Sequence, residues 1–235
     1  MHVVVLAPMT SELRPLVRQA RLSPRQVGDL AVHEGQVGAT EVSATLAGIG
    51  VERSAAVTER VLDALDPDHL VVCGIAGGLG PSTRVGDLIV PATVVDHHTG
   101  DSFDASPLGG RERTGTIVTS GELIEDHEVF TSLVDAGCTG IDMETAAVAR
   151  VCADRQVPWT AFRSISDLAT DGLDSEILAL VDTDGRPVAR NVLRFAATRP
   201  GRLSDLVKLS RGASLAARTA AAATLAACRE AAGGQ

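Results

Sequence analysis

Short apolar runs and amphipathic stretches alternate along most of the chain. Runs of Val, Leu, Ile and Ala bounded by Pro, Gly or polar residues predict strands, and apolar residues at three- to four-residue spacing predict helices. The predicted strands are residues 3–6, 30–34, 41–47, 69–73, 85–96 (interrupted near Pro91), 116–119, 140–143 and 159–165. The predicted helices are residues 10–20, 51–65, 124–136, a helix that begins at Glu144, and 177–182, 187–197, 203–209 and 213–231.

The order of these elements predicts an α/β protein with a single three-layer domain, in which helices flank a central mixed, twisted β-sheet. Residues 1–200 are expected to form this domain, and residues 201–235 a helical C-terminal extension packed on it. Aromatic residues make up only 2% of the chain, so Val, Leu, Ile and Ala must fill the core. That composition suits strands that are covered on both faces.

Charge and cysteine content limit the classes of binding partner and the cellular compartment that are expected for this protein. The net charge of −9 disfavours nucleic acid or an anionic membrane as the main partner. No run of about 20 apolar residues predicts a membrane span. The first residues lack a basic region and are interpreted as a strand rather than a signal peptide. Four widely spaced cysteines without a CxxC motif indicate reduced core thiols in a cytoplasmic protein.

The sequence lacks the motifs of several common catalytic and ligand-binding sites. The glycine-rich segment 74–80 is predicted to be a loop whose backbone N–H groups approach a ligand, but it matches neither GxGxxG nor a Walker loop. The six histidines form no HxH or HExxH pattern, so no metal site is predicted. The absence of GxSxG disfavours a nucleophilic hydrolase. The polar segment 97–115 is interpreted as a loop over the site.

The candidate carboxylates Asp142, Glu144 and Asp167 lie in the segment 140–167, which is otherwise mostly small and apolar. Glu144 follows a predicted strand and either binds a vicinal diol, as in ribose, or simply starts a helix. Asp167 ends a predicted strand, where it either donates a proton or caps the next turn. Arg163 is predicted on the same strand face and either pairs with a carboxylate or binds an anion. Glu12 has the spacing of an ordinary first-turn helix residue.

Four segments resemble one family and occur in its order: APMTSEL at 7–13, GIAGGLGPSTRVGDLIVP at 74–91, GIDMETAAVARVC at 140–152 and FRSISDLATD at 162–171. The chain resembles the purine nucleoside phosphorylase/uridine phosphorylase superfamily, close to its methylthioadenosine/S-adenosylhomocysteine nucleosidase branch. The resemblance covers about residues 1–200. It implies an enzyme that cleaves the N-glycosidic bond of a purine nucleoside without a cofactor, as a homodimer or higher homo-oligomer.

The resemblance also implies roles for individual residues. Asp167 matches the aspartate that protonates or hydrogen-bonds the purine N7, and Glu12 matches the glutamate that activates the attacking water. Glu144 matches the glutamate that binds the ribose hydroxyls, and Met143 matches the methionine packed against the ribose. The further substrate-binding positions are Met9, Ile49, Ile75, Gly77, Ile124 and Ser166.

Several positions depart from the nucleosidase pattern. Ile75 stands where those enzymes typically carry Ser, and the segment SGELIED offers Leu123 and Ile124 where they carry a Phe. These departures and the extra C-terminal helices look like the hopanoid-associated phosphorylase group, which acts on an adenosine with a bulky 5′ hydrocarbon. The resemblance therefore leaves the attacking nucleophile open.

Three functions follow from these alternatives. Hydrolysis is favoured because Glu12 is present and because APM at 7–9 replaces the Gly-Asp-Pro-x-Arg type loop of the phosphorylases. Phosphorolysis would need an arginine at the phosphate, for which Arg53 and Arg84 are candidates. A non-catalytic nucleoside-binding protein is the third alternative.

Overall fold

The computed structural model describes residues 1–168, 175–182, 184–186 and 188–231. Among these residues, 11 strands form one mixed sheet in the order β2-β3-β4-β1-β5-β10-β9-β7-β8, with β11 paired to β5 and β6. The strands are β1 (His2–Ala7), β2 (Ser23–Val27), β3 (Leu30–Val37), β4 (Thr40–Leu46), β5 (His69–Gly78), β6 (Leu88–Ile89), β7 (Thr93–Asp96), β8 (Ser102–Asp104), β9 (Thr116–Thr119), β10 (Cys138–Asp142) and β11 (Trp159–Leu168). The helices are α1 (Thr10–Ala20), α2 (Val51–Leu65), α3 (His127–Asp135), α4 (Thr145–Asp154), α5 (Ser175–Leu178), α6 (Ala189–Thr198), the 3-10 helix η1 (Pro200–Arg202) and α7 (Leu203–Ala231).

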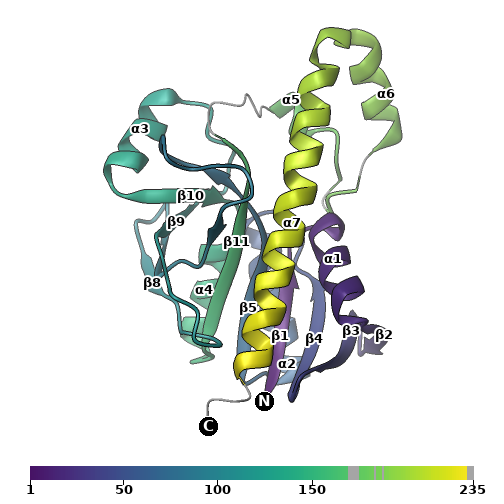
Figure 1. The fold of residues 1–235 in the computed structure, drawn as a ribbon, viewed down its shortest axis with the longest axis vertical. Coiled ribbons are helices and arrows are strands. Elements are labelled where there is room, and N and C mark those ends of the chain that lie inside the picture. Colours follow the sequence, from purple (N-terminus) through teal and green to yellow (C-terminus); the bar gives the residue numbers. More distant parts are fainter. Residues whose placement is uncertain (169–174, 183, 187, 232–235) are drawn as a thin grey trace.

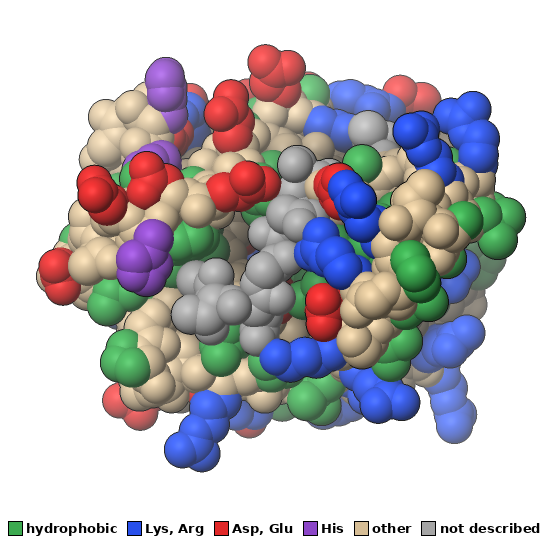
Figure 2. Space-filling view, turned by 90° about the horizontal axis from the view of Figure 1, so that it is seen from above, with side chains coloured by type: hydrophobic (Ala, Val, Ile, Leu, Met, Phe, Trp, Pro, Cys, Tyr) green, Lys and Arg blue, Asp and Glu red, His purple; other side chains and the backbone are tan. Residues whose placement is uncertain are grey.

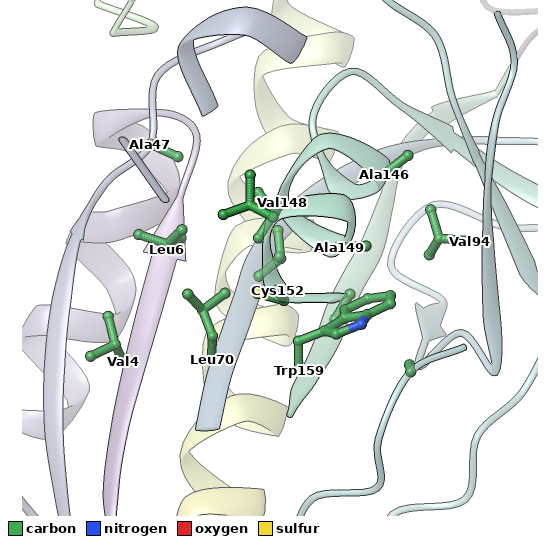
Figure 3. Close-up of a cluster of buried hydrophobic side chains, with 14 of the residues drawn as sticks. Val4, Leu6, Ala47, Leu70, Val94, Ala146, Val148, Ala149, Cys152 and Trp159 are labelled. Atoms are coloured by element: carbon green, nitrogen blue, oxygen red, sulfur yellow. The ribbon is translucent and has the colours of Figure 1, made fainter. Parts of the chain in front are cut away.

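Helices cover both faces of the sheet, which confirms the predicted three-layer α/β domain (Figure 1). α1 and α7 lie on one face, and α2 and α4 lie on the other. β1 shows how the sequence produces two cores, because successive side chains of a strand point to opposite faces. Val4 and Leu6 join the α2/α4 core, whereas Val3 and Val5 join the α1/α7 core. The α2/α4 core also contains Trp159 (Figure 3).

The four strands β4, β1, β5 and β11 run parallel to one another. Their carboxyl ends therefore meet at one edge of the sheet, which is where open α/β sheets bind their ligands. The start of α1, the connection into α2 and the last residues of β5 and β11 all lie at this edge. The fold thus gathers segments that are far apart in the sequence.

The predicted loop at 74–80 is wrong for most of its length, because β5 continues to Gly78. Residues 74–78 pair with β11 on one side, and Gly77 and Gly78 pair with β10 on the other. The glycines therefore allow strands to pack closely in the middle of the sheet. The predicted loop at 97–115 contains the short strand β8, which pairs with β7. The strand β2 was not predicted, because its sequence SPRQV is polar and mostly exposed at the sheet edge.

Several helix boundaries also differ from the predictions. α3 begins later than predicted, because Asp126 caps it by accepting a hydrogen bond of 2.8 Å from the backbone N–H of Glu128. α5 ends at Leu178, inside the predicted helix 177–182. The two predicted tail helices form one continuous helix, α7, of 29 residues.

α7 crosses β11 at very short range. A Cβ on Gly212 would lie 2.1 Å from the carbonyl oxygen of Ser166, so only glycine fits at that position. Further along α7, buried alanines such as Ala216 and Ala220 keep the helix close to the sheet. α7 is therefore part of the support for the end of β11.

The structure also bears on the predictions about cysteines and membrane spans. All four cysteines are free and buried, as predicted. Within the described residues, no helix has the length and apolar character needed to cross a membrane. Pro187 of the predicted helix 187–197 and residues 169–171 of the fourth sequence segment lie outside the described residues.

Candidate active site

The ten residues predicted to form the site all line one cavity of about 490 Å³ at the carboxyl ends of the parallel strands. This volume is in the range of small-molecule sites. The lining residues are Met9 and Glu12 at the start of α1, Ile49 before α2, Ile75 and Gly77 of β5, Ile124 before α3, Met143 and Glu144 between β10 and α4, and Ser166 and Asp167 of β11.

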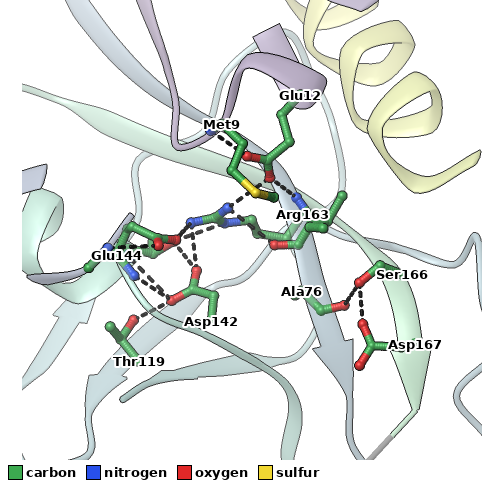
Figure 4. A network of polar contacts seen from close by, with 12 residues as sticks. Met9, Glu12, Ala76, Thr119, Asp142, Glu144, Arg163, Ser166 and Asp167 are labelled. Atoms are coloured by element: carbon green, nitrogen blue, oxygen red, sulfur yellow. Dashed lines mark hydrogen bonds and ion pairs between the residues drawn. The ribbon is translucent and has the colours of Figure 1, made fainter. Parts of the chain in front are cut away.

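Three carboxylates of the cavity surround the guanidinium of Arg163, whose side chain is completely buried (Figure 4). Its Nη2 atom lies 2.9 Å from Asp142 Oδ2 and 3.2 Å from Glu144 Oε2. Its Nη1 atom lies 3.9 Å from Glu12 Oε1 and donates a hydrogen bond of 3.2 Å to the carbonyl oxygen of Ile75. Of the two predicted roles for Arg163, the structure therefore shows the pairing with carboxylates, which a buried cation requires.

Asp142 ties this cluster to the start of α4. Its Oδ1 atom accepts hydrogen bonds from the backbone N–H groups of Glu144 and Thr145 at 3.3 and 3.2 Å, and from the Thr119 hydroxyl at 2.7 Å. An acidic side chain commonly satisfies a helix N-terminus in this way. No role was predicted for Asp142, although an Asp shortly before a predicted helix is a recognisable capping signal.

Glu12 is held by two short hydrogen bonds. Its Oε2 atom accepts one of 2.7 Å from the backbone N–H of Met9, and its Oε1 atom accepts one of 2.7 Å from that of Ile75. The Ile75 N–H was predicted to approach a ligand but holds Glu12 instead. Gly74 makes room for this arrangement, because a Cβ there would lie 2.3 Å from Glu12 Oε1 and 2.6 Å from Arg163 Nη1. Glu12 is thus both a first-turn helix residue and a cavity residue.

Burial changes the proton affinity of both glutamates. It raises the pKa of Glu12 to about 8, and the Arg163 guanidinium opposes this rise. Burial also raises the pKa of Glu144, again opposed by Arg163, while the neighbouring Asp142 adds to the rise. One guanidinium cannot neutralise three carboxylates away from water, so the cluster favours binding a proton near neutral pH. Such carboxyl groups suit proton transfer.

Asp167 lies apart from the Arg163 cluster, close to the end of β11 (Figure 4). The Ser166 hydroxyl donates a hydrogen bond to Asp167 Oδ1 and lies 3.3 Å from the carbonyl oxygen of Ala76. Asp167 is partly exposed, in contrast to Glu12 and Arg163. Its carboxyl group is therefore open to the cavity and to water.

The predicted common strand face of Arg163 and Asp167 is wrong. Arg163 pairs with Gly74, but Asp167 pairs with Gly77, and the register shifts between Ile165 and Asp167. An extra residue of this kind breaks the alternation of side chains along a strand. The bulge therefore directs Asp167 to a different part of the cavity from Arg163.

Two of the lining residues that were not predicted to belong to the site differ from the rest in their chemistry. Phe130 of α3 supplies an aromatic ring that the segment SGELIED lacks, and Arg202 of η1 is the one cation among the described lining residues. Neither could be found from local spacing, because each reaches the cavity only through the packing of its helix against the rest of the fold. Six carboxylates share the lining with Arg202: Glu12, Glu122, Glu125, Asp142, Glu144 and Asp167.

Comparison with protein families agrees with this architecture. The family model of the phosphorylase superfamily matches residues 2–112 and 104–198. The chain therefore belongs to the phosphorylase superfamily, in agreement with the four sequence segments.

Individual relatives narrow the comparison further. The 5′-methylthioadenosine/S-adenosylhomocysteine nucleosidase of Tolumonas auensis is 26% identical over 200 residues, which cover 72% of this chain and 87% of the relative. The structure of futalosine hydrolase of Helicobacter pylori superposes with a TM-score of 0.73 at 18% identity, over 98% of both chains. The Neisseria meningitidis 5′-methylthioadenosine/S-adenosylhomocysteine nucleosidase, in complex with methylthio-immucillin-A, gives a TM-score of 0.72 at 18% identity, over 97% of this chain and 98% of that one. Both structures therefore share the fold of this chain.

Proposed function

We propose that this chain is an N-glycosyl hydrolase that cleaves a purine nucleoside of the adenosine type, substituted at its 5′ position. The observation that carries the proposal is the presence of Glu12, Glu144 and Asp167 in one cavity of small-molecule size. Sequence relatives named as nucleosidases and structural neighbours named as nucleosidase and hydrolase support the reaction class.

In the proposed reaction, the bond between the ribose C1′ and the purine breaks, and the base leaves with the bonding electron pair. Asp167 donates a proton or a hydrogen bond to the base at N7, which makes it a better leaving group. Glu12 accepts a proton from water as the water oxygen bonds to C1′. General acid and base assistance of this kind contributes ~10²–10⁴-fold each to the rate.

Two further residues of the site act on the sugar. Glu144 accepts hydrogen bonds from the ribose hydroxyls, and Met143 packs against the ribose. The sugar gains positive charge as the base leaves, and the fixed negative charge of the Arg163 cluster stabilises it. The hydrogen bond of 3.1 Å that Glu144 Oε1 accepts from the backbone N–H of Gly50 supports this orienting role.

An apolar part of the cavity is proposed to receive the base. Ile124, Phe130 and Ile141 contribute side chains to it, and Asp167 lies at its edge. A Cβ on Gly77 would lie 3.1 Å from Ile141 Cγ2 and 3.9 Å from Asp167 Oδ2, so glycine leaves this part of the cavity open. A flat apolar ring beside a purine contributes favourable stacking.

The charge of the cavity favours water over phosphate as the nucleophile. Six carboxylates and one arginine line its described part, so a phosphate anion would meet net repulsion. The predicted phosphate ligands Arg53 and Arg84 are not among the described lining residues, and Arg53 pairs with Asp184 at 2.5 Å. The buried Arg163 is already surrounded by carboxylates.

The proposal also covers the cellular location and the oligomeric state of the enzyme. Four buried, free cysteines support a cytoplasmic location. The family resemblance supports a homodimer or higher homo-oligomer.

Release of free base tests the proposal directly. The protein is incubated with 5′-methylthioadenosine, S-adenosylhomocysteine, adenosine, inosine or futalosine, with and without phosphate. Base release without phosphate is expected. Release that depends on phosphate would replace hydrolysis with phosphorolysis. Nucleoside binding in calorimetry without release under either condition would favour the non-catalytic alternative.

A further inference from the structure

Positive charge is concentrated in one segment of this acidic protein. Residues 186–218, called the basic end below, contain eight of the 21 Lys and Arg residues but one acidic residue, Asp205. The segment therefore carries a formal charge of +7, and the rest of the chain carries −16. The basic residues are Arg186, Arg190, Arg194, Arg199, Arg202, Lys208, Arg211 and Arg218.

Large apolar side chains are exposed in the same segment. Leu193 of α6 is 71% exposed, and Leu203, Val207 and Leu215 of α7 are 39%, 48% and 43% exposed. Among the described residues, the one other exposed large apolar side chain is Met1 at the chain start. Exposed apolar residues that gather at one place commonly mark a contact surface.

The charged and apolar side chains are interspersed. On α6, Arg190 and Arg194 are one turn apart, with Leu193 between them, and on α7 the side chains of Val207, Lys208 and Arg211 line a surface hollow. Figure 2 shows Lys and Arg side chains, with hydrophobic ones among them, over the side of the molecule where α6 lies, and Asp and Glu gathered on the opposite side.

Several of these arginines have no ion-pair partner in the described part of the chain. In the described part of the chain, no ion pair joins Arg190, Arg194 or Arg211 to a carboxylate, whereas Arg199 pairs with Glu176 at 3.0 Å. Screening limits charge effects to ~8–10 Å at physiological salt, so a surface that touches the basic end would meet its local positive charge rather than the net charge of −9.

We propose that the basic end docks on an anionic lipid bilayer as a peripheral surface contact. Arginine and lysine around exposed aliphatic side chains are the combination by which interfacial helices bind, because the cations pair with lipid phosphates and the aliphatic groups enter the acyl boundary. This inference goes beyond the proposed reaction and does not depend on it. Arg202 of this segment also lines the cavity, so docking brings the cavity close to the bilayer.

Two other occupants fit the observations less well. A second copy related by two-fold symmetry would place this positive surface against itself, and like charges at an interface are unfavourable. Single-stranded nucleic acid is bound largely by stacking on aromatic side chains, but the exposed large apolar residues of the basic end are Leu and Val.

Sedimentation with vesicles tests the proposal. The wild-type protein is expected to bind vesicles of phosphatidylglycerol and phosphatidylcholine, but not of phosphatidylcholine alone, and to be released by 0.5 M NaCl (a screening length of roughly 4 Å). The triple variant R190Q/R194Q/R211Q should bind about a hundredfold more weakly, since each basic residue near an anionic surface contributes roughly fivefold. The double variant L193S/V207S should also bind more weakly, at unchanged charge.

The matched control is R14Q/R18Q/R21Q, which removes three exposed arginines at α1 and changes the net charge equally. It should bind like the wild type, and thermal unfolding checks that all variants fold. Absence of wild-type binding to anionic vesicles at low salt would overturn the proposal, as would an equal loss in the control. Binding to an oligonucleotide, or self-association lost in the triple variant, without vesicle binding would assign the surface to those partners instead.

Discussion

The two ends of the cavity hold their carboxylates in opposite ways. Glu12 and Glu144 are 1% and 5% exposed, and Arg163 together with backbone N–H groups fixes both. Asp167 is partly exposed at a strand bulge, where it contacts the hydroxyl of Ser166. A fixed charge is suited to binding and stabilising a sugar cation, because it needs no reorganisation during the reaction. A proton donor must instead regain its proton from water after each turnover, which exposure permits.

Removal of the Asp167 carboxylic acid should have the largest effect on activity. We expect Asp167→Asn to lower kcat by ~10²–10⁴-fold, because general acid assistance is lost while hydrogen bonding is largely kept. The unfolding midpoint should barely change. Single-turnover measurement of base release and thermal unfolding check both expectations.

Glu125→Gln provides the matched control, since Glu125 also lines the cavity and is exposed. Its kcat should stay within about threefold of the wild-type value, because a rim charge is screened by water. Near-complete activity of Asp167→Asn would show that another group acts as the acid.

Substitution of Arg163 should lower the stability of the protein as well as its turnover. Arg163→Met leaves Asp142, Glu144 and Glu12 buried without their cation, and loss of one partner in a buried ion pair costs ~3–5 kcal/mol. Urea unfolding should show this loss in the free energy of unfolding.

Arg155→Met is the control for this substitution. Arg155 also meets two carboxylates, those of Glu59 and Asp63, but on the surface. Exposed ion pairs are screened by water and contribute little to stability, so the loss on this substitution should be small. Equal losses in the two variants would mean that burial does not distinguish the Arg163 cluster.

Strands that are buried on both faces could be predicted, because they consist of a nearly continuous run of apolar residues, as in β1 and β11. The fold was not predictable where pairing partners decide, as for residues 74–78, whose glycines form strand only because β11 and β10 flank them. The polar edge strand β2 carries no apolar signal, because it packs against little.

The candidate site was likewise predictable from the sequence only in part. Spacing alone could not bring Glu12 and Arg163 together, because their contact depends on the space above Gly74. The family resemblance supplied the ten positions, which all reach the cavity. It could not supply Phe130, because this residue of α3 lies outside the four matching segments.

The raised pKa of Glu12 predicts opposite pH trends for activity and stability. A general base must be ionised, so with a pKa of about 8 the value of kcat/KM should rise about tenfold per pH unit below pH 8 and then level off. The folded state binds a proton that the unfolded state, with its pKa of 4.5, releases. The free energy of unfolding should therefore fall as the pH rises from 4.5 to 8.

Glu12→Gln separates these trends. It should abolish most activity and reduce the pH dependence of unfolding in that window, leaving the part that Glu144 contributes through its own raised pKa. A pH–rate profile and urea unfolding at several pH values give the two slopes. A flat activity profile between pH 6 and pH 8 in the wild type would contradict Glu12 as the base.

The apolar wall at the Asp167 end should produce the smallest change. Phe130→Leu keeps an apolar side chain but removes the aromatic face, which is worth ~0.5–1.5 kcal/mol beyond the buried area. KM should therefore rise about two- to tenfold with kcat nearly unchanged, because the ring binds ground state and transition state alike. Phe103→Leu is the control, since Phe103 lies on β8 outside the described lining and contacts Arg150. If kcat fell at constant KM, Phe130 would instead act in the chemical step and the two ends of the cavity would share that task.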